Sequence, residues 1–180
     1  MGFQLLGSRL LNPWFGSSII VWAFIISIFL AAFSMGSLLG GALVRLSGPA
    51  RFRGLLIVSC VAVAGFVFNA AFARAVLAGI DAWAPPVPLA LSVACGLLFL
   101  PPVCALSSLT PVLIQWVSES GQKAGFASGL VYCISTLGNI AGIMLTAFVL
   151  IPSVPMSSLL WIWSGGVAVT ALFLLRCLRA

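Results

Sequence analysis

Histidine is absent from this chain of 180 residues, and acidic side chains occur only at Asp81 and Glu119. Imidazole and carboxylate groups supply most general acids, general bases and metal ligands in proteins. The five cysteines are scattered and form no Cys-x-x-Cys pair, so the sequence predicts no zinc, haem or iron–sulfur site. We therefore expect a polypeptide without a metal, without a cofactor and without catalytic residues of its own.

Charged residues of any kind are also scarce. They make up 6% of the chain, whereas 63% of the residues are hydrophobic; an ordinary soluble domain has about a quarter of its residues charged. A soluble fold needs a polar exterior, which this composition cannot provide. The hydrophobicity continues to the last residues, so a secretory signal peptide does not account for it. The sequence predicts an all-α integral membrane protein.

Runs of about twenty apolar residues predict five full transmembrane helices, which form one transmembrane domain over residues 17–180. These helices are expected at about residues 18–46, 54–73, 87–116, 124–151 and 157–175. Pro101 and Pro102 should interrupt and kink the third helix, because proline cannot donate a backbone hydrogen bond.

Residues 1–16 precede these helices and are too short and too broken to span a bilayer. Arg9 lies between leucines, and Trp14 and Phe15 lie near the end of the segment. These features are typical of an interfacial helix, but they also fit the last turns of a partial transmembrane helix. The residues alone leave both alternatives open.

The basic residues lie between the apolar runs, and their distribution predicts the orientation. One side of the membrane receives six of them: Arg45, Arg51, Arg53, Lys123, Arg176 and Arg179. The other side receives only Arg9 and Arg74, the latter in an expected loop over residues 74–86. Because short loops rich in Lys and Arg stay inside, the C-terminus should be cytoplasmic. Topology and contact with anionic lipid headgroups thus explain the net charge of +6, without nucleic acid as a partner.

Small residues recur four positions apart within the expected helices. The pairs are Gly36 with Gly40, Gly125 with Gly129, and Gly138 with Gly142. On a helix this spacing makes a flat groove in which a second backbone can come close, as in tight helix pairs in lipid. The glycines therefore predict helix packing, with the sliding surface of a transporter as the alternative.

Polar side chains inside the expected helices are few, and three of them share one helix face. Tyr132, Ser135 and Asn139 have the spacing i, i+3 and i+7. A polar group in hydrocarbon costs several kcal/mol unless it is hydrogen-bonded, so this face should meet another helix or line a substrate path. Trp22 and Asn69 are further candidates for substrate-facing residues. The lack of a titratable group in the middle of the membrane argues against proton-coupled transport.

Three stretches resemble the membrane region that precedes the catalytic domain in bacterial spermidine synthase-like fusion proteins. They are NPWFGSSIIVWAFIISIFLAAFSMGSLLGGALVRL, LPPVCALSSLTPVLIQ and SGLVYCISTLGNIAGIMLTAFVLIP, in the order expected for that family. The resemblance covers nearly the whole chain and implies a multi-pass protein of the bacterial inner membrane. The soluble aminopropyltransferase-like domain of the family would begin after Ala180, so its catalytic residues are not in this chain and no such activity is assigned to it.

The same region is similar to half of a major facilitator superfamily transporter, a six-helix repeat whose first helix would be truncated here. That superfamily carries the loop pattern Gly-x-x-x-Asp-Arg-x-Gly-Arg-Arg between its second and third helices. The stretch GGALVRLSGPARFR keeps Arg45, Arg51 and Arg53 but has Val44 in the position of the acidic residue. The resemblance implies the helical repeat without the acid that takes part in ordinary gating.

These features lead to three functional hypotheses. The first is a non-catalytic membrane subunit that anchors a soluble spermidine synthase-like partner and aids transport of a polyamine-related product. Its docking surface would consist of Arg45, Arg51, Arg53 and Lys123. The second is a small-molecule transporter formed by a homodimer of such half-units, with aromatic side chains as the available partners for an amine. The third is a truncated membrane fragment or bare anchor.

Overall fold

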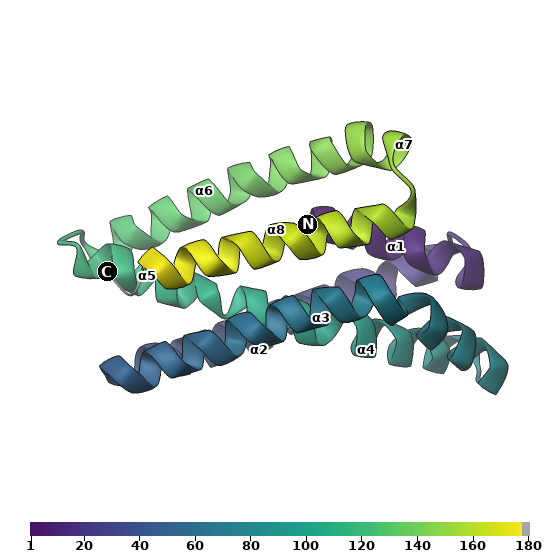
Figure 1. Cartoon of the computed structure of the whole chain (residues 1–180), viewed down its shortest axis with the longest axis horizontal. Helices are drawn as coiled ribbons and strands as arrows, with labels where there is room; N and C mark the ends of the chain where they lie inside the picture. Colours follow the sequence, from purple (N-terminus) through teal and green to yellow (C-terminus); the bar gives the residue numbers. More distant parts are fainter. Residues whose placement is uncertain (178–180) are drawn as a thin grey trace.

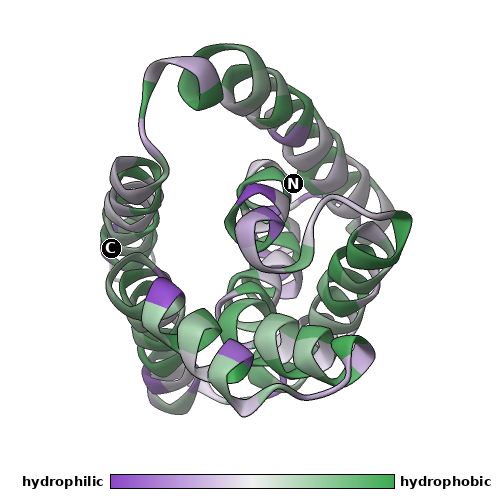
Figure 2. Ribbon diagram, turned by 90° about the vertical axis from the view of Figure 1, so that its right-hand side faces the viewer, coloured by the Kyte–Doolittle hydropathy of each residue, from purple (hydrophilic) through white to green (hydrophobic). Residues whose placement is uncertain are grey.

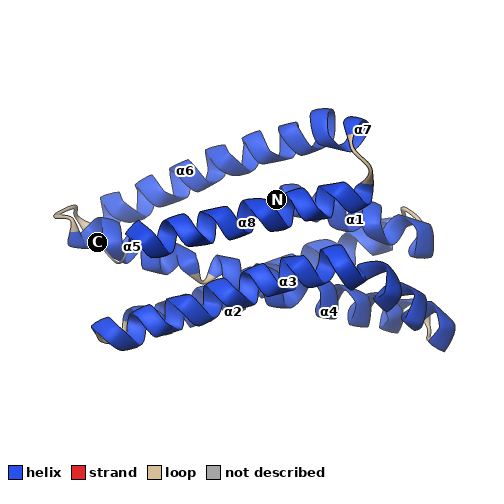
Figure 3. Cartoon of the chain, in the orientation of Figure 1, coloured by secondary structure: helices blue, strands red, loops and turns tan. Residues whose placement is uncertain are grey.

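The computed structural model describes residues 1–177, which form helices joined by short loops and contain no strand (Figure 3). The helices are α1 Gly2–Phe15, α2 Ile19–Val44, α3 Gly48–Trp83, α4 Val87–Ser107, α5 Leu109–Glu119, α6 Ala124–Met144, the π-helical η1 Leu145–Leu150, α7 Ile151–Ser153 and α8 Met156–Cys177. They give five segments long and apolar enough to cross a membrane, which confirms the predicted all-α membrane fold. Arg179 of the predicted basic side lies outside the described residues.

The second predicted span is much longer than the sequence suggested. Instead of covering residues 54–73, α3 has 36 residues and runs from Gly48 to Trp83, so the expected loop over residues 74–86 is largely helical. Arg53 and Arg74 are 21 residues apart, or about 32 Å along a helix, which matches a hydrocarbon core of about 30 Å. This spacing would put the two arginines at the two edges of the hydrocarbon, where a helix can continue into the headgroup region. Termination occurs at Ala84, whose φ of 48° is left-handed.

The third predicted span consists of α4 and α5, and the break between them falls at Ser108. Pro101 and Pro102 instead lie inside α4, so the predicted position of the interruption is wrong. Pro111 explains the actual position, because it has no N–H for the carbonyl group of Ser107, four residues earlier. The fourth span continues through η1 and α7 to Ser153, two residues beyond its predicted end.

The N-terminal helix α1 lies inside the bundle. Viewed along the bundle in Figure 2, it is surrounded by the longer helices. Leu6 and Leu11 are completely buried, and the Phe3 ring lies 4.5 Å from that of Phe66 between centroids. The guanidinium group of Arg9 donates a hydrogen bond of 2.7 Å to the carbonyl oxygen of Ile151. One face of α1 is thus packed against the bundle, while Arg9 stays exposed. Both the interfacial and the partial transmembrane helix stay predictions.

Two glycines of α2 allow its backbone to contact the junction of α4 and α5. A Cβ atom on Gly36 would overlap the Ser107 side chain and the Cys104 carbonyl group, and one on Gly40 would overlap the Ser108 carbonyl group. At this contact the Ser107 hydroxyl donates a hydrogen bond of 3.1 Å to the Ala32 carbonyl oxygen. The close approach thus gives α2 and α4 a polar link as well as dispersion contacts.

Asn69 joins α3 to α4 at the point where proline removes a helical hydrogen bond. Pro102 has no N–H for the carbonyl oxygen of Leu98. The Asn69 side-chain amide donates to that oxygen at 2.7 Å and to the Gly65 carbonyl oxygen at 2.8 Å. Since Asn69 is 1% exposed, no solvent can replace this donor. Asn69 therefore stabilises the helix pair.

We predict that Asn69→Ala lowers the free energy of unfolding by about 1–3 kcal/mol, because it leaves the buried Leu98 carbonyl group without a donor. Pro102→Ala supplies a backbone N–H for the same oxygen, so Asn69→Ala should be less destabilising in that background. Denaturant unfolding of the two single variants and the double variant in detergent measures this coupling. An equal loss of stability in both backgrounds would contradict the assigned role.

Candidate functional site

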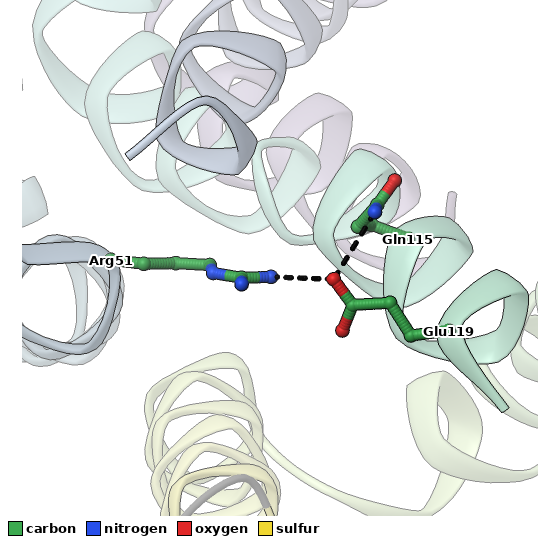
Figure 4. Close-up of polar contacts among 3 residues, drawn as sticks. All are labelled: Arg51, Gln115 and Glu119. Carbon is green, nitrogen blue, oxygen red and sulfur yellow. Dashed lines mark hydrogen bonds and ion pairs between the residues drawn. The ribbon is translucent and has the colours of Figure 1, made fainter. Parts of the chain in front are cut away.

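A polar cluster joins α3 and α5 at the end of the bundle that carries the basic residues, at the left in Figure 1. Arg51 lies in the first turn of α3, and Gln115 and Glu119 lie one turn apart in α5. Arg51 Nη1 donates to Glu119 Oε1 at 3.2 Å, and Gln115 Nε2 donates to the same oxygen at 3.1 Å (Figure 4). A cavity of about 250 Å³ lies beside this cluster, with Trp116 in its wall.

The ion pair is a weak link by itself. The side chains of Arg51 and Glu119 are 29% and 47% exposed, and exposed pairs of this kind contribute about 0–1 kcal/mol. Its larger effect is that Glu119 neutralises the positive charge of Arg51 on this surface. Glu119 is the only acidic residue at this end, because Asp81 lies in the last turn of α3 at the opposite end.

The remaining predicted docking residues have no acidic partner within the described part of the chain. Arg45, Arg53 and Lys123 are exposed, and the only ion pair within residues 1–177 is that of Arg51 with Glu119. Arg45 follows α2, Arg53 lies early in α3 and Lys123 precedes α6, so all three lie at the same end of the bundle. They form an uncompensated basic surface, which we call the basic end.

The predicted polar face of α6 is uncovered in this chain. Tyr132, Ser135 and Asn139 are all exposed, and within residues 1–177 the Tyr132 and Ser135 side chains have no hydrogen-bond partner. Asn139 Oδ1 accepts a bond of 3.4 Å from the Met1 amino group. Trp22 lies in the first turn of α2, and Asn69 is bound between α3 and α4. The structure therefore does not bring the five predicted substrate-facing residues together.

The glycines of α6 add to this uncovered face. A Cβ atom on any of the four would meet no atom within 4 Å: Gly125, Gly129, Gly138 and Gly142. In the most apolar stretch of the span Ala124–Ser153, 6% of the residues are buried within the chain, against 56% for Val87–Glu119. Figures 1 and 2 both show α6 standing apart from α8. Gly125, Gly129 and Gly138 are exposed, whereas the Gly142 carbonyl oxygen lies near Gly2 of α1, 3.1 Å from where a Cβ atom on Gly2 would stand.

Two residues that the sequence analysis did not single out line the interior. Trp163 of α8 contributes to two cavities of about 340 Å³ each, one shared with Phe3, Phe66 and Asn139 and one shared with Thr146 of η1. In the sequence, the only feature that could have drawn attention to these two residues is that Thr146 is a polar residue within the apolar run LTAFVLI. Its importance depends on the π-helical backbone and on α8, which the sequence does not reveal.

The fold and the site define an all-α, multi-pass integral membrane protein. Comparisons with family models, curated proteins and solved structures find no match to this chain. Within residues 1–177 no group of three His, Cys, Asp or Glu side chains is placed to hold a metal ion. The likeness to spermidine synthase-like membrane regions stays a prediction.

Proposed function

We propose that this chain is a non-catalytic membrane subunit that binds a soluble partner with an acidic surface at the basic end. The observation that carries the proposal is that the exposed residues Arg45, Arg53 and Lys123 form no ion pair within residues 1–177. The positive-inside rule places these residues on the cytoplasmic side. The partner implied by the resemblance is a soluble aminopropyltransferase-like protein, and the membrane subunit would aid movement of its polyamine-related product.

Electrostatic complementarity supports this role better than a catalytic one. A basic surface attracts an acidic partner and raises the rate of encounter, an effect that salt weakens. Anionic lipid headgroups also bind such residues, but they would not discriminate between protein partners. The Arg51–Glu119 ion pair ties the start of α3 to the end of α5 and so helps to fix the spacing of the basic side chains.

Neutralising the basic end should release the partner. We predict that the triple variant Arg45→Gln, Arg53→Gln and Lys123→Gln binds a co-expressed aminopropyltransferase-like protein about tenfold more weakly, because three exposed charge contacts are lost. Co-flotation of the partner with membranes at low salt measures the binding. Arg74→Gln, near the other end of α3, is the matched control.

A C-terminal green fluorescent protein on each variant reports whether the C-terminus is still cytoplasmic. Fluorescence in all variants, combined with release from the triple variant alone, is the expected pattern. Equal partner binding by the triple variant, the Arg74→Gln control and the unchanged chain would overturn the docking role.

The uncovered face of α6 favours a second candidate, a small-molecule transporter built from two copies of the chain. Exposed glycines and unpaired polar side chains are the features that helix pairs use in lipid. If two copies pack through this face, Ser135→Cys should give a disulfide-linked dimer in native membranes under mild oxidation. Cys133, two residues earlier and on the opposite side of the helix, serves as the internal control. A cross-link through Cys133 but not through residue 135 would count against this arrangement.

A further inference from the structure

A cavity of about 340 Å³ separates the π-helical segment η1 from α8. Its wall includes Gly142, Thr146, Ile162, Trp163 and Gly166, and none of its lining residues is charged. A second cavity shares Gly142 and Trp163 and reaches inward to aromatic side chains of α1 and α3. Volumes in this range are typical of sites for small ligands.

Thr146 presents a hydroxyl group to this cavity without a partner. The residue is 1% exposed, and its Oγ1 has no hydrogen bond to any residue in the range 1–177. Other helical hydroxyls in the chain donate to the carbonyl group four residues earlier: Ser92, Ser128, Thr136, Ser164 and Thr170. Ser59 of α3 is the other buried hydroxyl without a partner within residues 1–177. Thr146 differs from it in lying in a π-helical turn, and such turns occur frequently at functional sites.

Trp163 places a second unpaired group at the same cavity. Its indole Nε1 is buried and has no hydrogen-bond partner within the described part of the chain. A buried donor left unpaired costs about 1–3 kcal/mol, and hydrocarbon offers no solvent to compensate it. The Thr146 hydroxyl and the Trp163 ring lie close together, each 2.8 Å from where a Cβ atom on Gly2 would stand. Both residues line the same uncharged cavity.

We propose that the cavity between η1 and α8 binds an uncharged, largely apolar molecule from the bilayer through an oxygen atom of that molecule. A carbonyl oxygen accepts hydrogen bonds from both Trp163 Nε1 and Thr146 Oγ1, while the apolar body lies against Leu145, Leu150 and Ile162. The lining holds no charged residue, which favours an uncharged ligand over an amine cation or an anionic headgroup. This site is independent of partner docking at the basic end.

The probe that tests this site is 4-hexylbenzophenone, an uncharged ketone that cross-links to nearby C–H groups under light. With the full chain in phosphatidylcholine nanodiscs, saturable labelling is expected in peptides covering residues 142–170. Thr146→Val and Trp163→Phe should each raise the half-saturating concentration about three- to tenfold, because each removes one hydrogen bond. Both variants are checked by gel filtration and thermal unfolding.

Thr170→Val is the matched control. Thr170 lines the same cavity, but its hydroxyl already donates to the carbonyl groups of Gly166 and Val167 at 3.0 Å each. Its loss should leave labelling unchanged. Thr146→Val should not lower the melting temperature of the protein without probe, because the hydroxyl it removes has no partner.

Three results would overturn the proposal. The first is labelling that does not saturate or that spreads evenly over the lipid-facing surface. The second is equal labelling by an oxygen-free hexylphenyl diazirine with the same affinity, which would show an apolar cavity without hydrogen bonding. The third is a lower melting temperature of Thr146→Val without probe, which would show that the hydroxyl serves the fold.

Discussion

A backbone or side-chain polar group in hydrocarbon has no water to bind, so each one must find a partner inside the protein. The packing of this bundle depends on how that requirement is met. Where Pro102 leaves the Leu98 carbonyl group without its helical donor, the Asn69 amide of α3 supplies one. At the neighbouring contact, Ser107 donates to the Ala32 carbonyl oxygen, and Gly36 lets the two backbones approach. These contacts hold α2, α3 and α4 together.

The other side of the bundle meets the requirement less completely. The span that begins with α6 is barely covered by its own chain, and the Thr146 hydroxyl and Trp163 indole N–H groups remain unpaired beside a cavity. Unpaired atoms occur on both sides, since Ser59 Oγ and Asn69 Oδ1 of α3 also have no partner within residues 1–177. The flank formed by α6, η1 and α8 differs because its two unpaired groups belong to residues that line one cavity. Binding functions are expected at this cavity, which two residues with unpaired polar groups line, and at the basic end, where Arg45, Arg53 and Lys123 form no ion pair within residues 1–177.

Composition and apolar run lengths were sufficient to predict the membrane class, the all-α fold and the number of spans, since a bilayer fixes how long an apolar helix must be. The ends of the helices were harder to predict from the sequence. Arg53 and Arg74 suggested loop boundaries, yet both lie within α3, because arginines at headgroup depth are compatible with a continuing helix. The position of α1 inside the bundle depends on contacts such as Phe3 with Phe66, which join residues far apart in the sequence.

The roles of individual polar residues were also difficult to predict, because they depend on contacts between residues far apart in the sequence. Asn69 was visible in the sequence as a polar residue in an apolar helix, but its role depends on the Leu98 carbonyl group, 29 positions away. Tyr132, Ser135 and Asn139 do share one face of α6, as helical spacing requires. Thr146 and Trp163 became informative only when the structure showed that neither has a partner. Residue spacing predicts which groups share a helix face, whereas tertiary packing decides which of them remain unpaired.

The central claim is that the unpaired Thr146 hydroxyl and Trp163 indole N–H groups mark a binding site between η1 and α8, whereas the Asn69 side-chain N–H groups, which have partners, stabilise the fold. Cryo-electron microscopy of the chain in nanodiscs made from native membrane lipids, with a bound antibody fragment to aid alignment, tests this claim most directly. The account predicts non-protein density between η1 and α8, within hydrogen-bonding distance of Thr146 Oγ1 and Trp163 Nε1, and an Asn69 amide that is bonded to Leu98. A closed flank in which both unpaired groups bind carbonyl oxygens of the chain would contradict it.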